Sequence, residues 1–154
     1  MDLGDLIKPD AVIANLRARS KKALLPEIAS RAGELLKIDG ALIQEAIWRR
    51  EMLSSTGIGR GIAIPHARMP QVEHMFGMFA RMEQPIDFEA MDAQPVDLVF
   101  LLLAPEQAGA DHLQALARVS RLMRDPATLE RLRGSRTRTA MYAVLTEPST
   151  SNAA

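Results

Sequence analysis

The sequence predicts an α/β domain in which helices pack in layers against a β-sheet. A run at residues 96–104 that is apolar except for Asp97 is typical of a strand that is covered on both faces. Segments with helical periodicity lie on both sides of that run, so strands and helices alternate along the chain. The length of 154 residues, with 47% hydrophobic and 25% charged residues, fits one globular domain with a sizeable core.

The N-terminal third is expected to form a strand and two helices. Residues 10–16 are rich in small and β-branched side chains, which favours a strand. Residues 20–38 place apolar side chains at helical spacing, and Pro26 either delays the start of this helix or kinks its first turns. Asp39 is placed to cap the next helix. The expected inner face of that helix comprises Leu42, Ile43, Ala46, Ile47 and Leu53.

The middle of the chain is expected to form the sheet. Residues 61–65 and 75–82 are short strand candidates, and Gly77 in the second marks either a bulge or a close approach of another chain segment. A polar connector bounded by prolines then leads to the apolar run at 96–104, which we predict to be the central strand.

The C-terminal third is expected to be helical. Residues 109–123 are amphipathic, and Asp111 followed by Gln114 predicts an N-cap with a capping box. Residues 125–133 open with Asp-Pro, a pair that suits a cap and the first helical position. Residues 137–145 fit either a helix or a strand, and we favour a helix.

The composition excludes several classes of function. Nineteen basic and 19 acidic residues give a formal net charge of zero, so nothing global attracts nucleic acid or an anionic membrane. There is no cysteine, hence no disulfide, thiolate metal site or cysteine nucleophile. We find no secretory signal, and the run at 98–104 is too short to cross a bilayer. We therefore expect a cytoplasmic domain over residues 1–146, followed by a disordered tail at 147–154.

A glycine-rich segment leads to one of the three histidines. Glycines at 57, 59 and 61 precede the sequence IAIP and then His66. Dinucleotide and P-loop motifs require a helix directly after the glycines, whereas IAIP is strand-like, so we assign these glycines to backbone geometry. Pro65 restricts the backbone just before His66, and functional residues gather at the carboxyl ends of strands. The alternative is a histidine without a role at a strand edge.

Two further residues suggest an anion site. His112 is expected in the first turn of its helix, where the dipole favours a neutral imidazole and free N–H groups bind anions. A solvent-facing histidine is the alternative. Arg50 interrupts an apolar stripe, so it either extends outwards to solvent or points into a site that supplies an anion. With His66, these residues would form a phosphoryl-transfer site without nucleotide or metal, in which one histidine is the nucleophile.

Other charged residues are given weaker roles. His74 and the acids at 87, 89 and 92 show no recognisable ligand spacing, so we predict no metal site there. The seven arginines between 118 and 138 have a helical spread and no interleaved aromatic residues, which favours a solvated face over nucleic-acid binding. Docking of an acidic protein partner is the alternative for this stretch.

The motif STGIGRGIAIPHAR, preceded by RRE and followed by PVDLVFLLLAP and DHLQALARVSRLM, resembles the type-2 enzyme IIA family of the bacterial phosphoenolpyruvate-dependent phosphotransferase system. The resemblance runs from about residue 3 to residue 146. It implies a single α/β domain with a mixed β-sheet and helices packed on both faces, and no cofactor or metal. It also implies that His66 is phosphorylated, with His112 and Arg50 stabilising the phosphoryl group.

Within that family, the stretch PIDFEAMDAQPVDLVFLLLAPEQAGADHL looks most like the nitrogen-regulatory branch. This implies a nitrogen-type histidine phosphocarrier protein as phosphoryl donor and regulatory target proteins as further partners, with neither nucleic-acid binding nor direct membrane insertion. Two alternatives remain: a fructose- or mannitol-type relay that passes phosphate to a sugar permease domain, and a non-catalytic binding module. A metal-dependent hydrolase using His66, His112 and Asp111 is a third.

Overall fold

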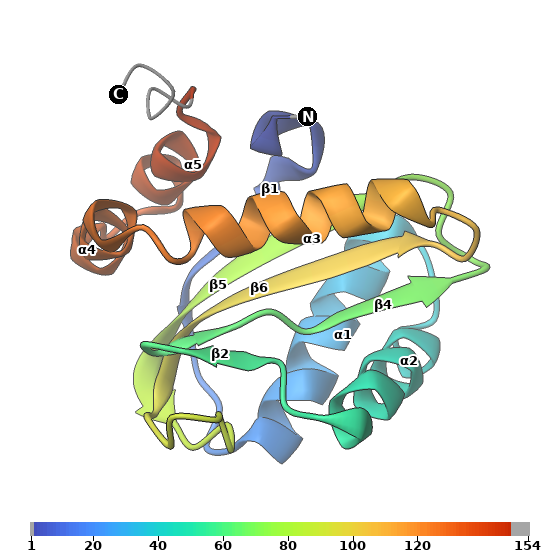
Figure 1. Ribbon diagram of the computed structural model, residues 1–154, viewed down its shortest axis with the longest axis horizontal. Helices are drawn as coiled ribbons and strands as arrows, with labels where there is room; N and C mark the ends of the chain where they lie inside the picture. The colour runs from blue at the N-terminus through green and yellow to red at the C-terminus, as the bar shows by residue number, and fades with distance from the viewer. Residues whose placement is uncertain (1, 149–154) are drawn as a thin grey trace.

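Six strands form one mixed β-sheet, and helices pack on both of its faces (Figure 1). The computed structural model describes residues 2–148. The strands are β1 (Ile7–Leu16), β2 (Gly57–Gly59), β3 (Ile62–Ala63), β4 (His66–Met69), β5 (Phe76–Ile86) and β6 (Val96–Pro105). The helices are a short 3₁₀ helix (Leu3–Asp5), α1 (Lys21–Leu36), α2 (Gly40–Leu53), α3 (Ala110–Leu122), α4 (Pro126–Gly134) and α5 (Arg138–Thr146).

Strand β6 is the centre of the sheet. The strand order is β1-β5-β6-β3-β2, and β4 also pairs with β6. Strands β3 and β4 run parallel to β6, whereas β5 runs antiparallel to it. Residues 98–104 are at most 1% exposed, which confirms the central strand expected from the apolar run. Because β3 and β4 pair with successive parts of β6, the short segment between them is held against the core.

The N-terminal elements confirm the expected strand and helices, with corrections. Strand β1 begins at Ile7, three residues before the predicted start. Helix α1 begins at Lys21 with Ser20 as its N-cap and contains Pro26, so the late start was wrong. Asp39 caps α2 as predicted, and its side chain accepts a hydrogen bond from the backbone N–H of Ala41.

The inner face of α2 is narrower than the sequence predicted. Ile43 and Ile47 are buried, but Leu42 is 39% and Leu53 81% exposed, so the assignment of these two leucines was wrong. The reason is that α2 packs mainly against α1 and β4, which cover only one side of the helix. None of the helices in residues 2–148 is long and apolar enough to cross a membrane.

The C-terminal helices form where expected, but α3 is capped differently. Its N-cap is Gly109, at φ +49°, and Asp111 lies inside the helix, so the capping box with Gln114 was wrong. The turn that follows β6 sets this start, because the N–H of Asp111 is already bonded to the carbonyl of Ala108 at 3.0 Å. Helices α4 and α5 confirm the remaining predictions. The predicted tail at 147–154 lies mostly outside the described residues.

Two glycine positions show why no side chain is tolerated there. A Cβ atom on Gly77 would lie 2.9 Å from Cε1 of Phe100, which confirms the predicted close approach. Gly61 has φ +84°, and its Cβ would lie 2.5 Å from the Arg133 guanidinium. The turn between β2 and β3 therefore packs directly on the ion pair between Arg133 and Asp97.

Candidate active site

His66 lies in β4, which pairs with β6 along the same edge as β3. It opens β4, opposite Leu102, rather than closing the preceding strand as the sequence suggested. The carbonyl of Pro65 accepts a hydrogen bond from the N–H of Leu102 at 3.0 Å, which fixes the backbone just before the imidazole. The glycine turn at 59–61 joins β2 to β3. Among residues 2–148 it forms no hydrogen bond with the His66 ring.

The hydrogen bonding of His66 assigns its two ring nitrogens. Nδ1 lies 2.8 Å from the carbonyl oxygen of Ile64. A carbonyl can only accept, so Nδ1 carries the proton and Nε2 keeps its lone pair in the neutral ring. Burial of the ring lowers the pKa of His66, and the charge of Arg50 lowers it further. No pattern in the sequence indicated this bond. It leaves Nε2 as the ring nitrogen with a free lone pair in the neutral ring.

His112 faces His66 from the first turn of α3. The two ring centroids are 5.7 Å apart and the ring planes are tilted by 55°. His112 is only 8% exposed, so it is not the solvent-facing histidine that was the alternative. Burial lowers its pKa, with smaller contributions from His66 and Arg68. Its buried Nε2 has no hydrogen-bond partner among the described residues, and such an atom is costly to leave unpaired.

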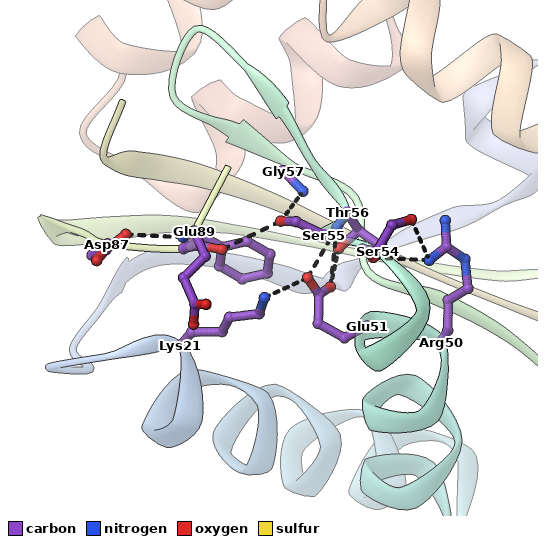
Figure 2. Close-up of polar contacts among 10 residues, drawn as sticks. Lys21, Arg50, Glu51, Ser54, Ser55, Thr56, Gly57, Asp87 and Glu89 are labelled. Atoms are coloured by element: carbon purple, nitrogen blue, oxygen red, sulfur yellow. Dashed lines mark hydrogen bonds and ion pairs between the residues drawn. The ribbon is translucent and has the colours of Figure 1, made fainter. Parts of the chain in front are cut away.

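Arg50 lies in the last turn of α2 and turns towards the loop that follows. Its Nη1 donates to the carbonyl oxygen of Ser54 at 3.0 Å and lies 3.5 Å from the hydroxyl of the same residue (Figure 2). Its positive charge is one of the causes that lower the pKa of His66, after burial of the ring. Within residues 2–148 its hydrogen bonds go to Ser54 alone, and its other N–H donors remain available.

A buried ion pair beside Arg50 escaped the sequence analysis. Glu51 is 5% exposed, and its carboxylate lies 2.6 Å from the ammonium group of Lys21. It also accepts bonds from the N–H and the hydroxyl of Thr56. A signal was present in the sequence: Glu51 follows Ile43 and Ile47 at intervals of four residues, so it shares their buried face.

Two of the other polar candidates, Asp87 and Asp92, have structural partners. Asp92 accepts hydrogen bonds from the N–H groups of Arg60 and Gln94, and these bonds lower the pKa of its carboxyl group. Asp87 similarly accepts from the N–H of Glu89. Residues 2–148 contain no group of three or more histidine or acidic side chains arranged to hold a metal ion. Asp87 and Asp92 each stabilise a turn through these bonds.

The arrangement around His66 is suited to an anion that is attacked by a nitrogen. A neutral imidazole presents the lone pair of Nε2, a second buried imidazole has an unpaired Nε2, and a guanidinium has spare donors. The first turn of α3 adds the positive end of a helix dipole. Such a set can bind and transfer a phosphoryl group with protein groups alone.

Comparisons with known proteins point in one direction. A model of the family described as "Phosphoenolpyruvate-dependent sugar phosphotransferase system, EIIA 2" matches residues 5–147. A nitrogen regulatory protein of Bradyrhizobium diazoefficiens is 51% identical over 148 residues, covering 96% of this chain and 97% of that protein. A fructose-specific EIIA component of Haloferax volcanii is 38% identical over 123 residues, 80% and 79% of the two chains. The crystal structure of nitrogen regulatory protein IIA-Ntr from Neisseria meningitidis superposes with a TM-score of 0.88 at 32% identity, covering 94% of this chain and 99% of that one.

Proposed function

The chain belongs to the EIIA 2 family of the phosphoenolpyruvate-dependent sugar phosphotransferase system, with nitrogen regulatory proteins among its relatives, and from this we propose that it is a phosphoryl relay. His66 accepts a phosphoryl group from a histidine phosphocarrier protein, and the phosphorylation state of His66 then controls binding to regulatory targets. The observation that carries the proposal is the neutral ring of His66, with Nδ1 bonded to Ile64 and Nε2 free, beside the unpaired Nε2 of His112.

The transfer step needs no added proton, water or metal. The lone pair on Nε2 of His66 forms a bond to phosphorus, while the N–P bond of the carrier's phosphohistidine breaks. Because the carrier's ring carries a proton on its other nitrogen, it takes back the electron pair and leaves as a neutral imidazole. The proton on Nδ1 of His66 stays in place. Positive charge that develops on the ring is stabilised by the Ile64 carbonyl, which accepts from Nδ1 at 2.8 Å.

His112 and Arg50 stabilise the transferred group. In the tautomer that carries its proton on Nε2, His112 donates to an equatorial phosphoryl oxygen and so satisfies an atom that is otherwise unpaired. The free donors of Arg50 bind a second oxygen, for which a planar guanidinium is well shaped. The charges of Arg50 and of the α3 terminus both favour an incoming anion.

The nitrogen-regulatory branch is the better supported of two relays. The identity of 51% to a nitrogen regulatory protein extends over nearly both full chains, whereas the fructose-specific relative matches at 38% over a shorter segment. The donor proposed is therefore a nitrogen-type phosphocarrier, with regulatory proteins in the cytoplasm as downstream partners. The fructose-specific relative keeps a second candidate open, in which the same phosphoryl group passes to a sugar permease domain.

The test is intact mass after incubation with phosphoenolpyruvate, enzyme I and a phosphocarrier, comparing sugar-type and nitrogen-type carriers. Wild type gains one acid-labile phosphate, His66→Ala gains none, and His74→Ala, which alters an exposed histidine, behaves like wild type. The carrier that reacts faster assigns the branch. Absence of any gain with either carrier would overturn the relay and favour a non-catalytic binding module.

A further inference from the structure

Glu51 is a buried acid whose hydrogen bonds go to Thr56 and whose ion-pair partner is Lys21 (Figure 2). Its carboxylate accepts from the N–H of Thr56 at 3.0 and 3.2 Å, from the Thr56 hydroxyl at 2.5 Å, and lies 2.6 Å from Nζ of Lys21. The Lys21 ammonium also lies 4.8 Å from the centre of the Phe88 ring. The start of α1, the end of α2 and two loops therefore meet at one buried ion pair.

Stability alone is a weak reason for such a pair. The Lys21 and Glu51 side chains are 11% and 2% exposed, so both charges have lost most of their contact with water. Desolvation offsets much of the attraction between buried charges, and well-packed apolar side chains often serve a fold equally well. The pair of Glu45 and Arg49 on the same helix differs, because its side chains are 58% and 77% exposed. That exposed pair is a matched control.

Electrostatics alone also disfavours an acid at this place. The charges that act on the two histidine rings come from Arg50, Glu51 and Arg68, together with the coupling of the rings to each other. Glu51 opposes Arg50 in its effect on His66 and would repel an incoming phosphoryl group. Pairing with Lys21 offsets part of that charge. Neither packing nor charge therefore accounts for a buried acid at this position.

The geometry links Glu51 to Arg50 through one turn. Residues 54–56 join α2 to β2, and Thr56 at the end of this turn is bonded to Glu51 through both its N–H and its hydroxyl. Ser54 at the start of the same turn provides the carbonyl that accepts a hydrogen bond from Nη1 of Arg50. The hydroxyl of Ser55 is bonded to a carbonyl of the β5–β6 connector. The turn thus fixes the guanidinium at one end and is itself fixed by the carboxylate at the other.

We propose that Glu51, with Lys21 as its counterion, is a positioning residue that holds the turn at 54–56 and thereby sets the orientation of the Arg50 guanidinium. The inference rests on the proposed phosphoryl transfer to His66. Glu51 contacts neither the phosphoryl group nor the histidines; it acts through the Ser54 carbonyl. A misplaced guanidinium would lose contacts that form only as the phosphoryl group is transferred.

The deciding experiment is the phosphorylation rate of Glu51→Gln at varied carrier concentrations, with Glu45→Gln as control. Charge and position predict opposite results, because removing a negative charge near an incoming anion should by itself raise the rate. Loss of positioning instead lowers kcat about 10- to 100-fold with little change in the KM for the carrier. Glu45→Gln retains the wild-type rate. Circular dichroism and urea unfolding establish that each variant is folded at the assay temperature.

A double-mutant cycle identifies the route of the effect. In an Arg50→Ala background, Glu51→Gln should cause almost no further loss of rate, because the group that it positions is absent. If Glu51→Gln does not fold, Thr56→Val takes its place in the same cycle, since it removes only the hydroxyl bond and keeps the buried ion pair. Its expected loss of rate is smaller and likewise disappears in the Arg50→Ala background.

Two failures are distinguishable. If wild type is not phosphorylated, the proposed relay is overturned and this inference with it. If wild type is phosphorylated but folded Glu51→Gln reacts at an equal or higher rate, the inference alone is overturned. An equal loss of rate in the presence and absence of Arg50 would likewise overturn it, because Glu51 would then act independently of Arg50.

Discussion

Two basic regions of this protein lie at opposite ends of α3 and are organised differently (Figure 1). At the start of α3, His112 lies beside His66, and the charge of Arg50 reaches the same site. At the other end of α3, the stretch 118–138 contains seven arginines and continues through α4 into α5. The second region holds far more positive charge, yet the first is the better candidate for anion chemistry.

The difference lies in where the hydrogen bonds go. Arg133 makes two bonds to Asp97, at 2.8 and 2.9 Å, and Arg131 is paired with Glu147. Arg138 donates to a backbone carbonyl of β1 at 3.0 Å. These three guanidinium groups are used by the fold, and most of the other arginines in the stretch are exposed to solvent, whereas the histidine site contains a buried nitrogen without a protein partner among the described residues. Unpaired capacity on a buried group, rather than density of charge, distinguishes the site from the scaffold.

The largest expected difference between the two regions appears when one arginine is removed from each. Arg50→Ala should lower the rate of phosphorylation of His66 about 100- to 1,000-fold, the usual effect of losing a transition-state donor. Arg50→Lys should restore only part of the rate, because a point charge lacks the planar fork. Arg131→Ala should react like wild type. Single-turnover phosphorylation with an excess of carrier gives the three rates, and a similar loss in both alanine variants would remove the distinction.

His112 offers a second test at the same site. His112→Ala should slow transfer to His66 about 10- to 100-fold, since a hydrogen bond to a charged group contributes about 1.5–3 kcal/mol. The phosphohistidine should still form when the reaction is left to completion. Leu113→Ala, which alters a neighbouring exposed side chain, should not change the rate. Complete loss of phosphorylation in His112→Ala would mean that its role is not stabilisation of the transferred group.

The sequence predicted the parts of the fold that depend on local patterns. The apolar run of β6 and the Asp125 cap of α4 could be assigned because each is specified by neighbouring residues. The start of α3 was wrong, because the turn after β6 fixes the helix at Gly109 before the side chain of Asp111 can act as a cap. Exposure of Leu53 was also missed, since it depends on which elements cover α2.

The candidate site likewise divides into features that local patterns predict and features that depend on tertiary contacts. His66 and Arg50 stood out because they end or interrupt apolar patterns, and His112 because of its expected place in the first turn of a helix. The structure brings the two histidines together. Their roles in transfer stay predictions. The bond of Nδ1 to Ile64 could not be predicted, because two residues so near in sequence form it only when the chain bends between β3 and β4. The pairing of Glu51 with Lys21 joins separate helices and was likewise beyond local patterns.

Arg133 tests whether the arginines of the stretch 118–138 contribute to stability rather than to phosphorylation. Arg133→Ala removes two bonds to Asp97 and one to the carbonyl of Arg60, so the free energy of unfolding should fall. The side chains of the pair are 37% and 26% exposed, which limits the loss to about 1–2 kcal/mol. The phosphorylation rate should not change. Urea unfolding measures the loss, with Arg121→Ala, an exposed arginine of α3, expected within about 0.5 kcal/mol of wild type.

The smallest expected effect is a shift in pH dependence, and it too separates the two regions. Burial and the charge of Arg50 lower the pKa of His66, so the ring is neutral at pH 7 and Nε2 is available. The rate should therefore be constant above the ordinary histidine pKa of about 6.5 and fall only as the pH drops through the lowered value.

Arg50→Ala removes a charge that disfavours the imidazolium, so the pKa of His66 should rise and the decline should begin at a higher pH. Arg131→Ala should leave the profile in place. Because the carrier's own histidine titrates in every sample, the measurement is the ratio of variant to wild-type rate across the pH range with one carrier. A ratio that is independent of pH for Arg50→Ala would mean that the guanidinium acts on the phosphoryl group alone and not on the nucleophile.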